Sequence, residues 1–287
     1  MKNIIKLLCT TALVLVGLFI VQPIQAQKTF DVISYNVLEG LQRDSTNIET
    51  FVKWAKEKDA DVIAYQEMNK FSQKELEQLA KRYGHPYAIM SKKEGFPVAI
   101  SSKYPIVNVK KVVDNMWHAF IYAMINDIHF YVIHFSPFSY EKRLEEINNV
   151  LAHAKTLPEN SKILIMGDFN SVDQSDAIQH TETMLEGMRK REEKQAHVRN
   201  LNNQQMDYSV MKTIKDAGFI DTYWLTNKES TYSITTKKYG KANRRIDFLW
   251  ASPSIASQVV SSTIIHDEYT DVMSDHYPVY VKFNLNK

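Results

Sequence analysis

The feature that most constrains the fold of this sequence is a series of short apolar runs, each bordered by polar residues. Apolar runs of about four to eight residues are typical of buried strands. In folds that alternate strands and helices, side chains at strand ends are held rigidly and face an open loop, which is where function usually lies. The runs and their polar ends occupy residues 33–37, 62–67, 131–134, 163–170, 244–250 and 274–279.

The segments between these runs predict the rest of the architecture. Helical spacing occurs over Ile48–Lys58 and Tyr140–Leu157, and Asn126-Asp127 is typical of a hairpin turn between two strands. A further strand is predicted at Ser230–Thr235. Strands interleaved with helices, together with hairpin-like pairs, predict an α/β four-layer sandwich of two mixed β-sheets flanked by helices.

The first 26 residues are predicted to be a signal peptide. Lys2 and Lys6 precede an apolar run, Leu7–Val21, and Ala26 offers a small residue at a cleavage point. The alternative is a membrane anchor, but the run of about 15 residues is short of the roughly 20 that a spanning helix needs. We therefore expect a secreted or periplasmic protein whose mature chain has no transmembrane segment.

The remaining residues, 27–287, have a length that suits one large α/β domain. Residues 177–205 differ from their surroundings because they are charged, mostly helix-forming and poor in β-branched residues. We expect a helical insertion there that packs over the domain, with a lid as the alternative. We expect a monomer.

Charge and cysteine usage exclude several classes of function. The chain has 35 Lys+Arg and 33 Asp+Glu, and without the two leader lysines the two totals are equal. A mature chain of zero net charge has no overall field that attracts nucleic acid. The only cysteine is Cys9, in the leader, so the mature chain has no disulfide, no cysteine-ligated zinc and no thiol nucleophile.

Taken one at a time, the polar strand ends allow structural interpretations as well as functional ones. Asn36 could form a turn, and Glu67 could be an acid at a helix N-terminus. A single histidine such as His134 is more often structural than catalytic. Asp168 and Asn170 together could form an Asx turn.

Asp247 is harder to explain structurally, because it interrupts an apolar run and a buried carboxylate requires a partner. His276 could be that partner. The polar ends also include the oxygen ligands Asn36, Glu67 and Asp275, and oxygen ligands without cysteine favour Mg²⁺, Mn²⁺ or Ca²⁺ over zinc. Such a set suits attack of water on a phosphate ester.

The ordered set SYNV, QE, H, GDFN, RIDF and SDH resembles the endonuclease/exonuclease/phosphatase superfamily. This superfamily includes AP endonucleases, secreted deoxyribonucleases, neutral sphingomyelinases, inositol polyphosphate phosphatases and deadenylases. The resemblance runs from Thr29 to Phe283, and residues 95–106 are similar to the family's G-x-A-I-x-S-x-x-P-I segment.

The resemblance implies a role for each matching residue. Glu67 would be the principal ligand of Mg²⁺ or Mn²⁺, helped by Asn36 and Asp275. Asp168 would orient or deprotonate the attacking water, and Asn170 would hold that water or a nonbridging oxygen.

The remaining implied roles concern the phosphate. Asp247 would pair with His276, fixing its tautomer and favouring imidazolium, and His276 would donate to the phosphoryl oxygen. His134 would also contact the phosphate, and Arg143 is a further phosphate candidate.

The expected function is that of a secreted, divalent-metal-dependent phosphodiesterase or phosphatase. Its substrate stays open, because one fold and one catalytic core serve very different esters. The alternative is a secreted endonuclease acting on DNA or RNA, whose backbone could be followed by Lys92-Lys93, Lys237-Lys238, Lys241 and Arg244-Arg245. A non-catalytic binding module on the same fold is the third reading, and the intact set of ligands disfavours it.

Overall fold

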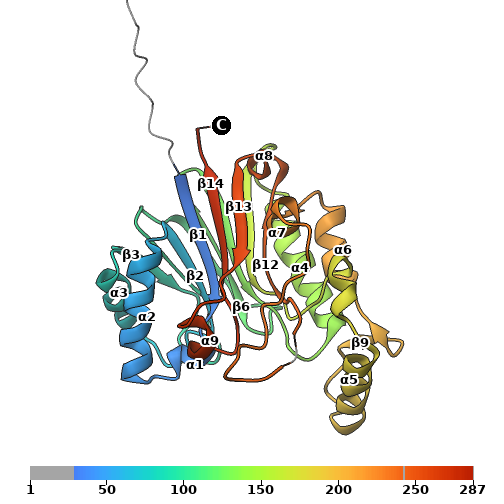
Figure 1. Ribbon diagram of the computed structural model, residues 1–287. Coiled ribbons are helices and arrows are strands. Elements are labelled where there is room, and N and C mark those ends of the chain that lie inside the picture. The colour runs from blue at the N-terminus through green and yellow to red at the C-terminus, as the bar shows by residue number, and fades with distance from the viewer. Residues whose placement is uncertain (1–28, 242, 287) are drawn as a thin grey trace, which may run out of the picture.

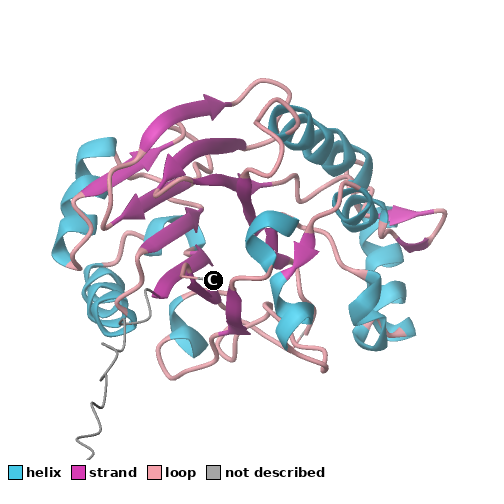
Figure 2. Ribbon diagram, turned by 90° about the horizontal axis from the view of Figure 1, so that it is seen from above, coloured by secondary structure: helices cyan, strands magenta, loops and turns pink. Residues whose placement is uncertain are grey.

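The structure is a computed structural model that describes residues 29–241 and 243–286. Two six-stranded mixed sheets pack face to face, and helices cover their outer faces (Figures 1 and 2). The predicted four-layer α/β sandwich is therefore confirmed. The predicted signal peptide lies outside the described residues. Within the described ranges, no helix combines the length and apolar character needed to cross a membrane.

The first sheet has the strand order β13-β14-β1-β2-β4-β3, in which only β1 and β2 are parallel. Two helices, α2 (Ser45–Lys58) and α3 (Gln73–Arg82), pack on its outer face. The strands are β1 (Thr29–Asn36), β2 (Val62–Gln66), β3 (Tyr87–Met90), β4 (Ala99–Ser102), β13 (Val259–Ile264) and β14 (Val279–Asn284).

The second sheet has the order β11-β12-β8-β7-β6-β5, in which only β7 and β8 are parallel. Its outer face carries α4 (Tyr140–Ala154) and α6 (Ser209–Asp216). Asn126 and Asp127 connect β6 to β7 with φ of 49° and 59°, which confirms the predicted hairpin turn. The strands are β5 (Val107–Val112), β6 (Ala119–Ile125), β7 (Ile128–His134), β8 (Lys162–Asp168), β11 (Ile220–Asp221) and β12 (Asp247–Ala251).

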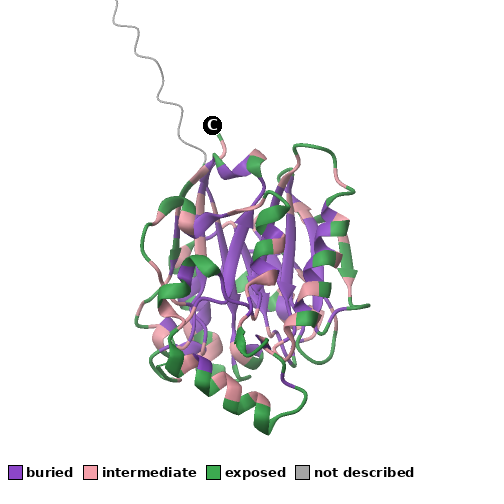
Figure 3. Ribbon diagram, turned by 90° about the vertical axis from the view of Figure 1, so that its right-hand side faces the viewer, coloured by how far each residue is buried: buried purple, intermediate pink, exposed green. Residues whose placement is uncertain are grey.

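The apolar core has three layers, one between the sheets and one beneath each pair of helices. In β1, Val32 points between the sheets, whereas Ile33 and Tyr35 point toward α2. Both faces of the central strands are therefore buried (Figure 3), which explains why their sequences are apolar without alternation.

Gly167 allows β7 and β8 to approach closely just before their functional ends. Its φ is 142°, and a Cβ at this position would lie 2.0 Å from the carbonyl oxygen of Ile133. Any other residue would force the two strands apart. The glycine therefore fixes the position of the residue that follows it, Asp168.

Residues 177–205 form several small elements at one end of the sandwich. After a 3₁₀ turn, Gln174–Gln179, the chain forms α5 (Glu182–Lys194) and then enters a hairpin of β9 (Leu201–Asn202) and β10 (Gln205–Met206). In Figure 1, α5 lies at the lower edge, the end toward which β1 runs.

The prediction of a strand at Ser230–Thr235 is wrong. Ile234 makes only isolated bridges, one with Arg244 and one with His276. The β-branched and aromatic residues there suit a strand, but the backbone crosses between two segments instead of extending one sheet. Shorter helices complete the described chain: α1 (Leu38–Leu41), α7 (Thr222–Thr226), α8 (Pro253–Ala256) and α9 (Thr270–Met273).

Candidate active site

Strand register brings three of the predicted residues side by side. Asp168 is the last residue of β8, and its register partners are His134, at the end of β7, and Asp247, at the start of β12. All three side chains are buried. The second sheet thus carries a histidine and two aspartates in a row at the ends of three neighbouring strands.

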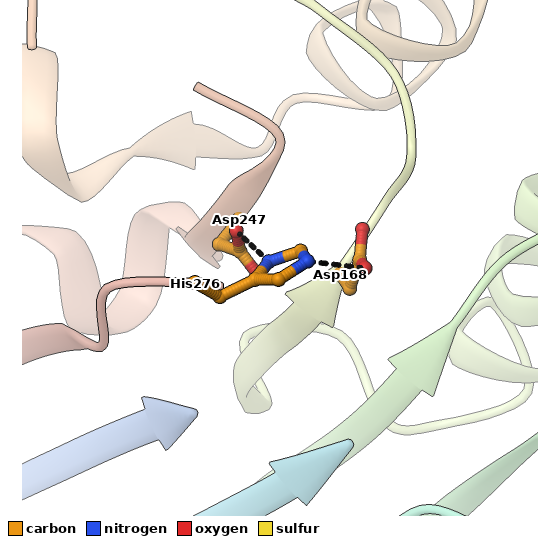
Figure 4. A group of neighbouring side chains, drawn as sticks. All are labelled: Asp168, Asp247 and His276. Atoms are coloured by element: carbon orange, nitrogen blue, oxygen red, sulfur yellow. Dashed lines mark hydrogen bonds and ion pairs between the residues drawn. The ribbon is translucent and has the colours of Figure 1, made fainter. Parts of the chain in front are cut away.

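His276 completes this row from the segment between α9 and β14. Its Nδ1 lies 2.8 Å from Oδ2 of Asp247, and its Nε2 lies 3.8 Å from Oδ2 of Asp168 (Figure 4). Nε2 of His134 lies 3.5 Å from the same Asp168 oxygen. Asp168 is therefore flanked by two imidazoles, one of which is held by a second carboxylate.

The environment sets different protonation states for the two histidines. Burial alone would lower the pKa of His276, but the carboxylates of Asp247 and Asp168 outweigh it and raise this pKa to about 10. Burial, followed by the charges of His118 and His276, holds the pKa of His134 well below its usual range. At neutral pH, His276 is an imidazolium and His134 is a neutral imidazole.

Asp168 itself is a carboxyl group with a weakened preference for the charged form. Burial, and after it the charge of Asp247, raises the pKa of Asp168 to about 7. The positive charge of His276 acts in the opposite direction. A carboxylate of this kind accepts a proton from water more readily than an exposed one does.

The first sheet contributes Asn36 and Glu67, at the ends of its two parallel strands. Asn36 is the register partner of Gln66, so Glu67 lies one residue beyond the end of β2, with φ of 62°. Oε1 of Glu67 accepts a hydrogen bond of 3.1 Å from Nδ2 of Asn36, and Oε2 accepts one of 3.0 Å from the amide of Glu39. Nδ2 of Asn36 also donates to Oδ2 of Asp168 at 3.2 Å, which connects the two sheets.

Asp275 is brought to this edge by its neighbour. Oγ of Ser274 donates to the carbonyl oxygen of Asn36 at 2.7 Å, which ties residues 274–276 to the end of β1. Burial raises the pKa of Glu67, and the charge of Asp275 contributes to this shift. Two carboxylates that repel each other beside Asn36 suit a divalent cation that prefers oxygen ligands.

Asp168, Asp247 and His276 also have ligand atoms within 4.8 Å of one another, the spacing of a possible metal cluster. Mg²⁺ and Mn²⁺ prefer oxygen ligands, whereas this grouping offers them a histidine nitrogen, Nε2, since Nδ1 of His276 is hydrogen-bonded to Asp247. The residues that suit Mg²⁺ or Mn²⁺ are therefore Glu67 and Asp275, with Asn36 beside them.

Asn170 forms the turn with Asp168 that its sequence position allows. Its backbone amide donates to Oδ1 of Asp168 at 2.8 Å, as in an Asx turn, with φ of 47°. Its Nδ2 donates to the carbonyl oxygen of Phe135 at 3.0 Å, and the side chain lines the same cavity as Asp168. The turn thus places the side chain of Asn170 in the lining of this cavity, beside Asp168.

A cavity of about 480 Å³ has an aromatic wall opposite the predicted site residues that line it, which are Glu67, His134, Asp168, Asn170 and His276. Phe96, Trp117 and Phe138 lie on this wall, and Trp117 is 51% exposed. The rings of Trp117 and Phe138 meet edge to face at 5.2 Å, while His118 stacks on His134 at 4.1 Å. Sequence reasoning missed this wall, because isolated aromatic residues in loops carry no periodic pattern.

Arg143 does not line the cavity. Its buried guanidinium donates to Oγ of Ser171 at 2.8 Å, to the carbonyl oxygen of Ser136 at 3.0 Å and to Oδ1 of Asn200 at 2.7 Å. These contacts hold the loops that follow β7 and β8. Its role in the structure is to position the loop that carries Asn170.

The basic residues considered for a nucleic-acid backbone lie in different surroundings. Arg245 is buried in ion pairs with Asp176 and Asp221, and Lys237 pairs with Asp271. Lys92 lines the cavity at Asp168, whereas Lys241 and Arg244 line a second cavity.

Residues 33–276 match the model of the Endonuclease/Exonuclease/phosphatase family. The chain belongs to this family and is a metal-dependent hydrolase of phosphate esters. No curated protein matches it.

Solved structures of other proteins have the same fold. An AP endonuclease from Archaeoglobus fulgidus superposes with a TM-score of 0.70 at 20% identity, covering 89% of this chain and 100% of the other. A 3′-5′ exonuclease from Neisseria meningitidis superposes with a TM-score of 0.65 at 16% identity, covering 89% of this chain and 100% of the other. At such identities the likeness shows the fold alone.

Proposed function

We propose that this enzyme is a secreted phosphodiesterase or phosphatase in which Asp168 activates the attacking water. One observation carries the proposal: three side chains from different parts of the fold converge on Oδ2 of Asp168. They are those of Asn36, His134 and His276. A carboxylate surrounded by donors can accept a proton from water while its neighbours hold the phosphate.

The groups around Asp168 act on the phosphate and on the attacking water. His276, as imidazolium, donates from Nε2 to a phosphoryl oxygen where negative charge develops, and Asp247 holds the ring through Nδ1. Asn170 donates to the water or to a nonbridging oxygen. A divalent cation held at Glu67, Asn36 and Asp275 would neutralise the phosphate and stabilise the departing oxygen.

The test is hydrolysis by the mature chain, residues 27–287, with Mg²⁺ or Mn²⁺ and with EDTA. The substrates are bis(p-nitrophenyl) phosphate, sphingomyelin, phosphoinositides, DNA and RNA. Asp168→Asn should lose at least about 10²-fold in turnover, the usual scale for general-base help. Asp114→Asn, at an exposed residue that does not line the cavity, is the control. Equal activity of Asp168→Asn and wild type on every substrate refutes the proposal.

A nuclease is the second candidate, and the aromatic wall of the cavity favours it. Phe96, Trp117 and Phe138 offer faces on which a base beside the cleaved phosphate can stack. One solved structure of the same fold, a 3′ phosphatase from Neisseria, holds a product DNA hairpin. Trp117→Ala should then raise KM for single-stranded DNA about tenfold or more, given roughly 1–3 kcal/mol per stacked base. An unchanged KM for DNA removes this candidate.

Secretion is part of the proposal and rests on the basic, apolar and small-residue order of residues 1–26. Expression of the full chain in a bacterial host, with the N-terminus of the exported protein determined by mass spectrometry, tests it. A start at Gln27 is expected. Retention of Met1 in a membrane fraction would contradict it. We also propose a monomer, which light scattering tests.

A further inference from the structure

A second cavity of about 760 Å³ lies between α5 and the segment before β12. The charged side chains that line it are Arg191, Lys241, Arg244 and Glu192. Three of these are cations and one is an acid, so the cavity is basic. The Glu192 carboxylate already accepts a hydrogen bond of 2.7 Å from the amide of Leu201.

Of these three cations Arg244 is the most buried, since it is partly buried whereas Arg191 and Lys241 are exposed. Across residues 29–241 and 243–286, no carboxylate lies within ion-pair distance of its guanidinium, although it is partly buried. Its neighbour Arg245 has two such partners, Asp176 and Asp221. Burial, and after it the charge of Arg191, lowers the pKa of Arg244. The protein alone therefore holds two like charges beside one cavity, an arrangement that a bound anion stabilises.

The second cavity adjoins the catalytic one across a pair of hydrogen-bonded loops. The amide of Arg199 donates to the carbonyl oxygen of Phe138 at 2.6 Å, and Nδ2 of Asn200 donates to that of Pro137 at 3.1 Å. Pro137 and Phe138 line the catalytic cavity, and Asn200 lines the second one. The two cavities are therefore neighbours, and Arg244 is close enough to Asp168 for its charge to act on the guanidinium.

We propose that this cavity is a second phosphate-binding subsite, in which Arg191 and Arg244 hold a phosphate of the substrate other than the one that is hydrolysed. The inference rests on the proposed function for the first phosphate. Two sources share this chemistry: the adjoining phosphate of a nucleic-acid backbone and the second phosphate of a small phosphorylated polyol.

Matched substrate pairs test the subsite and separate the two sources. One pair is dithymidylate with and without a 5′-phosphate, and the other is fructose 1,6-bisphosphate and fructose 6-phosphate. For Arg191→Gln and Arg244→Gln, the ratio of kcat/KM for the two-phosphate member to that for the one-phosphate member should fall at least about tenfold. Lys190→Gln, an exposed charge on the same helix that does not line the cavity, should leave the ratio unchanged.

The pair that responds identifies the source. A ratio that is unchanged in both arginine variants, or that falls equally in Lys190→Gln, overturns the subsite.

Absence of hydrolysis on every substrate would refute the proposed function and leave the subsite untested by kinetics. A binding measurement without metal tests the subsite in that case as well. In EDTA, inorganic pyrophosphate should raise the melting temperature of wild type and of His276→Ala, but not that of Arg244→Gln. Arg244→Gln should also melt higher than wild type without anion, because it removes one of two like charges. Equal stabilisation of Arg244→Gln and wild type by pyrophosphate overturns the inference, as does loss of stabilisation in His276→Ala alone.

Discussion

Replacing Asp247 with asparagine tests how the active site controls the charge of His276. The two side chains are buried and joined by a 2.8 Å contact between Oδ2 and Nδ1. Asparagine keeps the shape and can still accept a hydrogen bond, so the fold should survive while the negative charge is lost. The change therefore separates an electrostatic role from a structural one.

The size of the effect follows from the pKa of His276. A value of about 10, against an ordinary value near 6.5, corresponds to about 5 kcal/mol in favour of the imidazolium. Asp247 and Asp168 share this effect, and Asp247 is the closer, at 2.8 Å against 3.8 Å. Loss of one such charge should lower the pKa of His276 by about 1–3 pH units. Because folding raises the pKa of His276, its pairing with Asp247 adds to the free energy of unfolding. This contribution is complete below about pH 6.5 and is lost as the pH rises toward 10.

The assay is the pH dependence of kcat and kcat/KM for Asp247→Asn, His276→Ala and the double variant. Asp247→Asn should move the alkaline limb of the profile to lower pH and reduce turnover about 10²-fold or more, as for loss of a charge-stabilising donor. The double variant should be little worse than either single one, since the two residues act as one unit. Additive losses, or an alkaline limb that does not move in Asp247→Asn, would show that the residues do not act as a pair.

Three further predictions concern the metal, the close contact of two strands and a buried histidine. EDTA should abolish hydrolysis, and Mg²⁺ or Mn²⁺ should restore it. Addition of Mg²⁺ should raise the melting temperature of wild type but not that of Glu67→Gln. Full activity in EDTA would contradict the oxygen-ligand site. Gly167→Ala should destabilise the fold by several kcal/mol, roughly 4 or more, because its Cβ would lie 2.0 Å from the carbonyl oxygen of Ile133; urea unfolding close to wild type would refute this. Burial lowers the pKa of His85 to about 4, so the free energy of unfolding should be full above about pH 6.5 and should fall by about 3 kcal/mol as pH drops to 4. His85→Asn should remove about one proton from this dependence in urea titrations, and an unchanged slope would contradict the assignment.

Much of the fold could be predicted because strand and helix periodicity is a local property of the chain. Runs such as 62–65 and 163–167 contain no charged or amide side chain, and in the structure both of their faces are buried. The same local reasoning failed at Ser230–Thr235, whose residues suit a strand but have no sheet to extend.

A site residue could be predicted from sequence where its polarity differs from that of the residues around it. Asp247 interrupts an apolar run, and a buried carboxylate requires a partner, so the sequence itself indicated that it is paired. The structure supplies that partner in His276, at 2.8 Å. Arg143 carries no such conflict in sequence, and only its buried contacts show that it braces a loop.

Sequence by itself determined which side chains end the buried strands, because burial of apolar residues and exposure of the strand ends follow from local pattern. Only the tertiary structure decided which of these ends meet. The register of β7, β8 and β12 aligns His134, Asp168 and Asp247, and packing of the two sheets brings Asn36 to Asp168. Tertiary contacts also form the aromatic wall, and among residues 29–241 and 243–286 they bring no carboxylate within ion-pair distance of Arg244. Such features depend on distances between segments far apart in the chain, and no local pattern encodes those distances.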